Sequence, residues 1–197
     1  FAKEWSEDPT SNNHVMRLLA EENKILWLNS IATRTPDFAS RNDIKKIARK
    51  LKNIGGGPRE VSPGLHVYSP IVFPFPHNPL ATTVNRQILR ATLGHLRRRL
   101  GMSRFQAWTF LPTAAEYIGT LGEELSVYYC TDEWSQFSNV DREKVAEQER
   151  LLLSKVDLVF ATSQGLLERK KRFNAETYLA SHGVDQAHFA RALDTAT

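Results

Sequence analysis

The chain has 197 residues, of which 41% are hydrophobic and 10% aromatic, and it carries a formal charge of +4 with a pI of about 9.3. This length and apolar content suit one domain with a full core and are too small for two ordinary domains. A single cysteine, Cys130, excludes a disulfide framework and a zinc site built from cysteines, and favours a reducing, cytoplasmic compartment.

No apolar run approaches the roughly 20 residues of a membrane-spanning helix, and the opening "FAKEWSEDPT" lacks the pattern of a signal peptide. "FAKEW" itself begins inside a strand pattern, so we expect the first strand to start before residue 1. The mild positive charge permits anionic partners without identifying one.

Short apolar runs bounded by polar residues predict buried strands in the segments 25–30, 65–73, 105–111, 125–130 and 157–163. A further strand is expected at "TYLAS", which begins at Thr177. Pro and Gly mark loops at 53–64 and 74–83. Apolar residues with helical spacing predict five helices between these strands. The residues that form these patterns are Val15, Leu18 and Leu19; Ile44, Ile47, Ala48 and Leu51; Val84, Ile88, Leu89, Leu93, Leu96 and Leu100; Val145, Leu152 and Val156; and Leu166, Leu167 and Phe173.

Strands and helices therefore alternate along the whole chain. Each parallel connection needs a crossover of a dozen or more residues, usually a helix. The sequence predicts an α/β fold, a doubly wound, mostly parallel sheet with helices on both faces. Asp43, Asp141 and Ser163 stand where three of the helices begin and are expected to cap them.

Ligands of doubly wound sheets bind outside the carboxyl ends of the strands, so the loops that follow strands carry the candidate sites. The first loop, "SEDPTSNNHV", brings Ser11, Asn12, Asn13 and His14 to the start of a helix. These groups suit a phosphate or sugar hydroxyls, and an ordinary helix-capping cluster is the alternative interpretation.

A second candidate, "YYCTDEWSQF", follows the most apolar strand with Asp132, Glu133 and Trp134. Two carboxylates beside aromatic rings suit the polar and C–H faces of a sugar. The alternative is that Asp132 caps a turn and Trp134 packs as a lid. Only one of the two adjacent carboxylates is required to face a cleft.

Other motifs favour structural roles. "GGGPRE" follows a predicted helix and lacks the ending of a phosphate-binding loop, so we interpret it as a helix terminator. His182 and His188 have no third ligand near them in the sequence, and we predict neither a metal site nor a cofactor. Cys130 lies in an apolar run and is expected to be a buried small residue.

Basic residues cluster in one predicted helix, "VNRQILRATLGHLRRRLGMSR". Its arginines are either a solvated face that complements the helix dipole or a contact with an anionic surface such as lipid headgroups. Aromatic residues do not interleave with them, so we predict no nucleic-acid partner, although the pI leaves that class as a third option. The arginines in question are Arg86, Arg90, Arg97, Arg98 and Arg99.

The segment from "YYCTDEWSQF" through "VDREKVAEQERLLLSKVDLVFATSQGLLERKKRFNAETYLASHGVDQAHF" resembles the end of the amino-terminal domain of bacterial GT-B glycosyltransferases. In these enzymes a strand ending in "TS" precedes a helix, and the next strand runs into "NGVD…F". The chain looks closest to the teichuronic-acid type of cell-surface polysaccharide glycosyltransferases, and the likeness extends to "HVMRLLAEENKILWLNS". His182 stands where the family usually has Asn, and "SEDPTSN" replaces its Gly-rich first loop.

This resemblance implies a Rossmann-like, acceptor-binding domain over residues 1–182 and the start of a linker to a donor-binding domain over 183–197. It implies transfer of a sugar from a nucleotide-sugar donor to a glycan or lipid-linked acceptor, at the cytoplasmic face of a membrane. Asp132, with Glu133 as the fallback, is the expected catalytic carboxylate. A non-catalytic Rossmann-like module that binds a nucleotide or another ligand is the alternative function.

Overall fold

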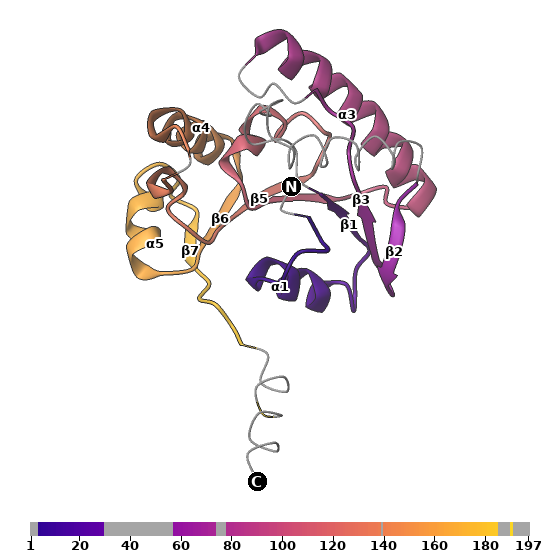
Figure 1. The fold of residues 1–197 in the computed structure, drawn as a ribbon. Helices are drawn as coiled ribbons and strands as arrows, with labels where there is room; N and C mark the ends of the chain where they lie inside the picture. Colours follow the sequence, from indigo (N-terminus) through magenta and orange to yellow (C-terminus); the bar gives the residue numbers. More distant parts are fainter. Residues whose placement is uncertain (1–3, 30–56, 74–77, 139, 185–189, 191–197) are drawn as a thin grey trace.

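A computed structural model of the chain describes residues 4–29, 57–73, 78–138, 140–184 and 190. Its strands form a four-stranded sheet, in which all neighbours run parallel, and a three-stranded mixed sheet (Figure 1). The first sheet has the order β4-β5-β6-β7, with strands Gln106–Thr109, Leu125–Cys130, Leu158–Ala161 and Thr177–Leu179. The second has the order β1-β3-β2, with strands Ile25–Leu28, Leu65–Tyr68 and Arg59–Ser62.

Helices cover the sheets from both sides, as the sequence predicts for an α/β fold (Figure 1). One core cluster contains side chains of α3, α4 and α5, packed on one face of β4–β6. The other contains Met16 of α1 and Ala20, which follows it, packed with Trp27 of β1, Phe110 just after β4 and Tyr129 of β5. The helices span Ser11–Leu19 (α1), Pro79–Leu100 (α3), Arg142–Lys155 (α4) and Gln164–Lys171 (α5).

Two of the predicted helix caps are confirmed. The Asp141 side chain accepts from the Lys144 amide at 3.2 Å, and Ser163 Oγ accepts from the Leu166 amide at 3.3 Å. Such bonds satisfy backbone donors that the first turn of a helix leaves free. The third predicted cap, Asp43, and the helix it precedes lie outside the described residues.

Four sequence predictions of local structure are wrong in part. Residues 59–62, expected in a loop, form β2, which pairs antiparallel with β3. Residues 79–83, also expected in a loop, are the beginning of α3. In the predicted first strand, the described residue Trp5 lies in a turn. In α1 the inward residues are Met16 and Asn13, whereas Leu18 is 66% exposed.

The β2 error has a local cause. "REVS" is polar, because only one side of this edge strand meets the core, and so it lacks the apolar run on which the prediction depended. The turn that joins β2 to β3 was visible as Pro63–Gly64. Gly64 has φ +76°, the left-handed conformation that glycine adopts at little cost.

Candidate functional site at the carboxyl edge of the parallel sheet

The carboxyl ends of β4, β5, β6 and β7 meet at one edge, because all four strands run parallel. Backbone bonds continue the pairing up to this edge: the Thr162 amide donates to Cys130 O at 3.2 Å, and the Ala180 amide donates to Ala161 O at 2.9 Å. Thr162 Oγ1 also donates to Thr131 O at 3.1 Å. The segments that follow β5, β6 and β7 therefore lie in this order along the edge, each about 5 Å from the next.

The start of α1 contacts the segment after β7. Ser11 Oγ and His182 Nδ1 are 2.6 Å apart and form a hydrogen bond between residues 171 positions apart in the chain. This bond brings the first predicted loop to the carboxyl edge, where the doubly wound topology predicts the loops that follow strands. From the sequence, His182 stood out as a departure from the family pattern and as a histidine without enough neighbouring ligands for a metal; in the structure it forms a hydrogen bond with Ser11.

The other polar residues of that loop divide into two groups. Asn13 is 1% exposed and its Oδ1 accepts from the Thr10 amide at 3.0 Å and from Thr10 Oγ1 at 3.1 Å. Asn13 therefore serves as a helix cap, the alternative interpretation of the sequence. Asn12 Oδ1 is buried and has no hydrogen-bond partner among the described residues, and His14 is half-buried. The predicted binding roles of Ser11, Asn12 and His14 stay predictions.

Asp132 is exposed directly after β5. Its Oδ2 accepts from Thr131 Oγ1 at 2.8 Å, and its backbone carbonyl accepts from Cys130 Sγ at 3.4 Å. The short 3-10 helix that follows, Trp134–Gln136, receives no side-chain cap. Asp132 is thus a solvent-accessible carboxylate at the edge of the sheet, two strand spacings, or about 10 Å, from the segment that carries His182.

Glu133 lies in an ion-pair network instead. Its carboxylate accepts from Arg169 Nε at 2.9 Å and from Lys170 Nζ at 2.8 Å. Lys170 Nζ also donates to Glu149 Oε2 at 2.8 Å, and Tyr128 OH donates to Glu149 Oε1 at 2.8 Å. Two carboxylates and two cations balance in this cluster, so Glu133 holds α5 to the end of β5.

Burial and ion pairing act in opposite directions in this network. Burial raises the pKa of Glu133, but hydrogen bonds and charge from Lys170 and Arg169 outweigh it, and the pKa lies below its usual value. Burial lowers the pKa of Lys170, yet hydrogen bonds to Glu133 and Glu149 leave it raised. Both groups therefore stay charged around neutral pH.

Trp134 lies beside the two carboxylates and stacks obliquely on Phe137, with ring centroids 5.4 Å apart. Its indole Nε1 is buried and has no hydrogen-bond partner among the described residues. Phe137 is 45% exposed. The pair therefore leaves part of an aromatic surface exposed a few residues after Asp132, and the predicted sugar contact of Trp134 stays a prediction.

The predicted basic surface on α3 is smaller than the sequence indicated. Arg97 folds back on the loop after the helix: its guanidinium donates to Met102 O at 3.3 Å and Ser103 O at 2.7 Å and lies 3.7 Å from the Phe105 ring centroid. Arg86 is half-buried, with Nε unpartnered among the described residues. The exposed arginines of the predicted set are Arg90, Arg98 and Arg99.

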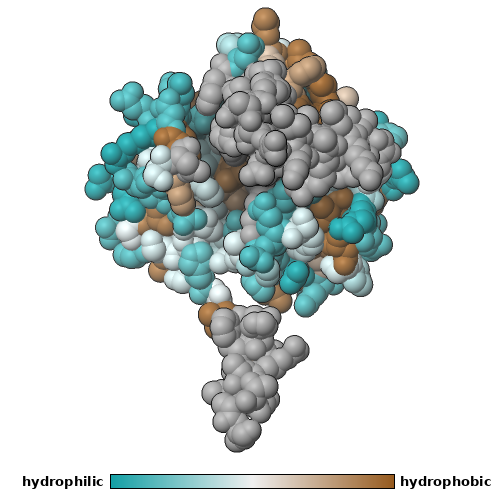
Figure 2. Space-filling view, viewed as in Figure 1, coloured by the Kyte–Doolittle hydropathy of each residue, from teal (hydrophilic) through white to brown (hydrophobic). Residues whose placement is uncertain are grey.

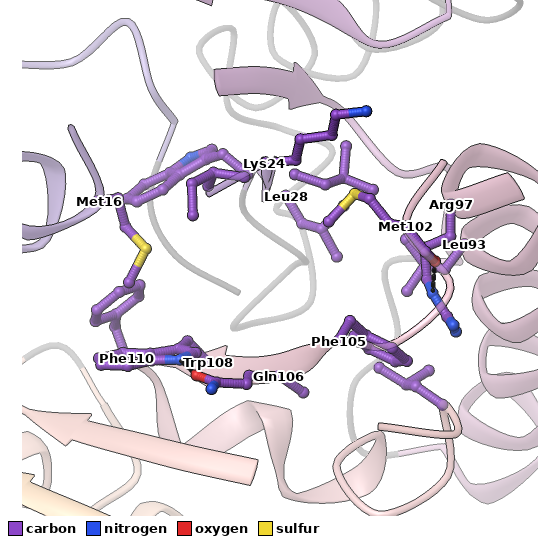
Figure 3. Close-up of a pocket in the computed structure, with 15 residues that line it drawn as sticks. Met16, Lys24, Leu28, Leu93, Arg97, Met102, Phe105, Gln106, Trp108 and Phe110 are labelled. Carbon is purple, nitrogen blue, oxygen red and sulfur yellow. Dashed lines mark hydrogen bonds between the residues drawn. The ribbon is translucent and has the colours of Figure 1, made fainter. Parts of the chain in front are cut away.

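Three cavities among the described residues are lined by none of Ser11, Asp132, Trp134 and His182. One, between β1 and β4, is lined mainly by apolar side chains (Figure 3). Two shallower ones surround Lys24. Within the described ranges no group of three or more His, Cys, Asp or Glu side chains is arranged to hold a metal ion. In the same ranges no helix combines the length and apolar character needed to cross a membrane.

Sequence reasoning missed Lys170 and Glu149, which look like ordinary surface charges in "ERKKRF" and "VAEQER". A signal was present in the helical spacing. Lys170 follows the buried Leu166 by four residues, and Glu149 precedes the buried Leu153 by four, so each lies on the inward face of its helix.

Comparison with known protein families and with curated proteins finds no match to this chain.

Proposed function

We propose that this chain is the acceptor-binding, amino-terminal domain of a GT-B glycosyltransferase that transfers a sugar from a nucleotide-sugar donor to a glycan or lipid-linked acceptor. The observation that carries the proposal is the row of polar groups at the carboxyl edge of the parallel sheet, from the Ser11–His182 pair to the exposed Asp132. Parallel α/β sheets bind their ligands at this edge.

The chemistry of the row suits a saccharide. Hydroxyl, amide, imidazole and carboxylate groups form hydrogen bonds with sugar hydroxyls, and the rings of Trp134 and Phe137 offer an apolar face to the C–H side of a pyranose. The Asn12 oxygen and the Trp134 Nε1 lack partners among the described residues. A ligand hydroxyl could donate to the Asn12 oxygen, and a ligand oxygen could accept from the Trp134 indole N–H, which makes both atoms candidates for ligand contacts.

Asp132 is the proposed general base. In an inverting enzyme it would take the proton of the acceptor hydroxyl as that oxygen bonds to the anomeric carbon and the nucleoside diphosphate leaves, a role that contributes about 10²- to 10⁴-fold in rate. In a retaining enzyme it would orient the acceptor only. Glu133 is a poorer base, because two cations hold its carboxylate.

Peripheral binding to an anionic membrane is a further part of the proposal. Exposed Arg90, Arg98 and Arg99 lie on α3, whose amino-terminal half also exposes Leu80 and Val84. Figure 2 shows hydrophobic atoms at the top of the molecule, where Figure 1 has the beginning of α3. Each arginine near an anionic surface contributes on the order of 1 kcal/mol.

Vesicle flotation tests the membrane part. We expect binding to vesicles of anionic phosphatidylglycerol, weaker binding to neutral phosphatidylcholine, and loss of the difference in a variant with all three exposed arginines changed to Glu. Arg97 stays unchanged in that variant, because its replacement would disturb the loop it holds. Equal binding to both lipids would contradict the membrane contact.

A second candidate, a non-catalytic module that binds a nucleotide, is favoured by two observations. Glu133 is occupied in a structural network, and the described cavities lie away from Asp132. A site that only binds a nucleotide does not require a free carboxylate to act as a base.

Calorimetry separates the two functions. In the proposed division of labour the chain binds p-nitrophenyl glycosides, as acceptor probes, and does not bind UDP-glucose or GDP-mannose. Asp132→Asn should weaken the glycoside signal, and Glu147→Gln, which alters an exposed carboxylate of α4, should leave it unchanged. Micromolar binding of either nucleotide sugar would favour the nucleotide-binding module.

A further inference from the structure

Asp132 is the one exposed residue in the stretch 129–135, where every other residue is buried or half-buried. This stretch carries the chain from the end of β5 into the short 3-10 helix Trp134–Gln136. The turn therefore presents a single carboxylate to solvent. The bonds made by its neighbours show what fixes the direction of that carboxylate.

The backbone that leads into Asp132 is held from two sides. Thr162, a buried residue that follows β6, donates its amide to Cys130 O at 3.2 Å and its Oγ1 to Thr131 O at 3.1 Å. The buried thiol of Cys130 donates to Asp132 O at 3.4 Å. The carbonyls of three consecutive residues, 130 to 132, thus each accept a hydrogen bond from a buried residue.

The residue after Asp132 is held from α5. The Glu133 carboxylate accepts from Lys170 Nζ at 2.8 Å and from Arg169 Nε at 2.9 Å. Lys170 is itself fixed, because its side chain is 4% exposed and its Nζ also donates to Glu149. The Glu133 side chain therefore anchors the turn after Asp132, as the Thr162 bonds anchor it before Asp132.

The Asp132 carboxylate is directed by the hydroxyl of its neighbour. Thr131 Oγ1 donates to Asp132 Oδ2 at 2.8 Å. Thr131 O belongs to the planar peptide group that joins these two residues, so the bond from Thr162 Oγ1 fixes the plane across which their side chains meet. The other carboxylate oxygen, Oδ1, has no hydrogen bond to a described residue and is open to a ligand.

We propose that Thr131 and Thr162 are positioning residues for Asp132. Two hydroxyls act in series: Thr162 holds the Thr131 carbonyl, and Thr131 holds Asp132 Oδ2, so that Oδ1 is directed to the ligand. A carboxylate already held in one rotamer loses less conformational freedom on binding, which favours affinity. The positioning follows from these contacts alone, whereas its effect on a saccharide rests on the proposed function.

Hα–Hβ scalar couplings of Asp132 in labelled protein report its rotamer. In the unaltered chain they should have the values of a single rotamer. Thr162→Val keeps the shape of the side chain and removes its hydroxyl, so the couplings should move toward the values of a rotamer mixture. Thr131→Val should do the same by removing the second hydroxyl. Thr162→Ser, which keeps the hydroxyl, should preserve the single rotamer.

Thr109→Val is the matched control. Thr109 is also buried, ends the neighbouring strand β4, and donates its hydroxyl to a backbone carbonyl, Leu111 O, at 3.1 Å. Its replacement removes the same kind of bond at the same edge of the sheet and should leave the Asp132 couplings unchanged. A rotamer mixture in the unaltered protein, or unchanged couplings in both the Thr162→Val and Thr131→Val variants, would overturn the positioning role.

Calorimetric titration with p-nitrophenyl glycosides extends the test to the ligand. Thr162→Val and Thr131→Val should weaken binding about 2- to 10-fold, because Asp132 must then be ordered on binding. Thr162→Ser and Thr109→Val should bind as the unaltered protein does. Unchanged affinity in variants whose couplings have averaged would overturn the effect of positioning on binding. If the unaltered protein binds no glycoside, the proposed function fails, and the couplings still decide whether the two threonines position Asp132.

Discussion

Replacement of Lys170 is expected to lower the stability of the fold strongly, although a lysine in a basic segment is the kind of residue usually found at the surface. The Lys170 side chain is 4% exposed, and its Nζ lies 2.8 Å from both Glu133 and Glu149. Lys170→Met keeps most of the buried aliphatic volume and removes the charge. Among the described residues, the Glu149 side chain, 6% exposed, would then keep as donors only the Tyr128 hydroxyl and the weak Cys130 thiol.

The magnitude follows from the uncompensated carboxylate. Breaking a buried ion pair by removing one partner costs about 3–5 kcal/mol, because the remaining charge is desolvated without its counterion. For a chain of this size, 1 kcal/mol corresponds to about 2–4 °C in Tm. We therefore expect Lys170→Met to lower the free energy of unfolding by about 3–5 kcal/mol and Tm by roughly 6–20 °C.

Urea denaturation followed by tryptophan fluorescence and by circular dichroism measures the loss. Lys171→Met is the matched control, since Lys171 is the exposed neighbour in α5, and it should change stability by less than about 0.5 kcal/mol. Adding Glu149→Gln to Lys170→Met should recover part of the loss, because the buried charge is then gone.

The network also predicts a pH signature. The folded pKa of Glu133 lies below its usual value, so Glu133 contributes stability above its unfolded pKa of about 4.3, and this contribution is lost as the pH falls toward the folded pKa. Lys170→Met should therefore lose less stability on acidification from pH 5 to pH 3 than the unaltered protein. The reasoning is refuted if Lys170→Met is within 1 kcal/mol of the unaltered protein at pH 7, or if the double variant is no more stable than the single one.

Two further predictions concern Cys130 and Gly64. Burial raises the pKa of the Cys130 thiol to about 12, so at pH 8 it should react with Ellman's reagent only as the protein unfolds; rapid reaction in the native state would contradict this. Gly64→Ala should destabilise more than Gly122→Ala in thermal denaturation. Both glycines have positive φ, but only at Gly64 would the new Cβ meet a backbone atom, Ala20 O at 2.8 Å. Equal losses would show that the contact relaxes.

The centre of the parallel sheet was predictable because β5 is buried on both faces and β6 is buried or half-buried along its length. "LSVYYC" and "DLVFATS" are continuous apolar runs, which is the pattern of such strands, and they form β5 and β6. The polar edge strand β2 has no such run. The position of β2 depends on its pairing with β3. In the sequence, the Pro63–Gly64 turn was the signal that pointed to a hairpin there.

The candidate site was predictable as a region and not as a set of contacts. Parallel topology places the loops after β5 and β7 at one edge, so the neighbourhood of Asp132 and His182 followed from the fold class. The Ser11–His182 hydrogen bond joins residues 171 positions apart, and the Glu133–Lys170 ion pair joins residues 37 positions apart. Such pairs depend on how helices dock on the sheet, which local pattern does not determine.

Binding of a saccharide at the carboxyl edge is the central claim, and amide chemical shifts measure it most directly. Titration of labelled protein with p-nitrophenyl glycosides should shift the amides of Ser11, Asn12, Asp132, Trp134 and His182 together, and these shifts should be much smaller with Asp132→Asn. UDP-glucose at the same concentration should leave the same amides in place. Saturating shifts elsewhere, no shifts with any glycoside, or a stronger response to UDP-glucose would contradict the claim.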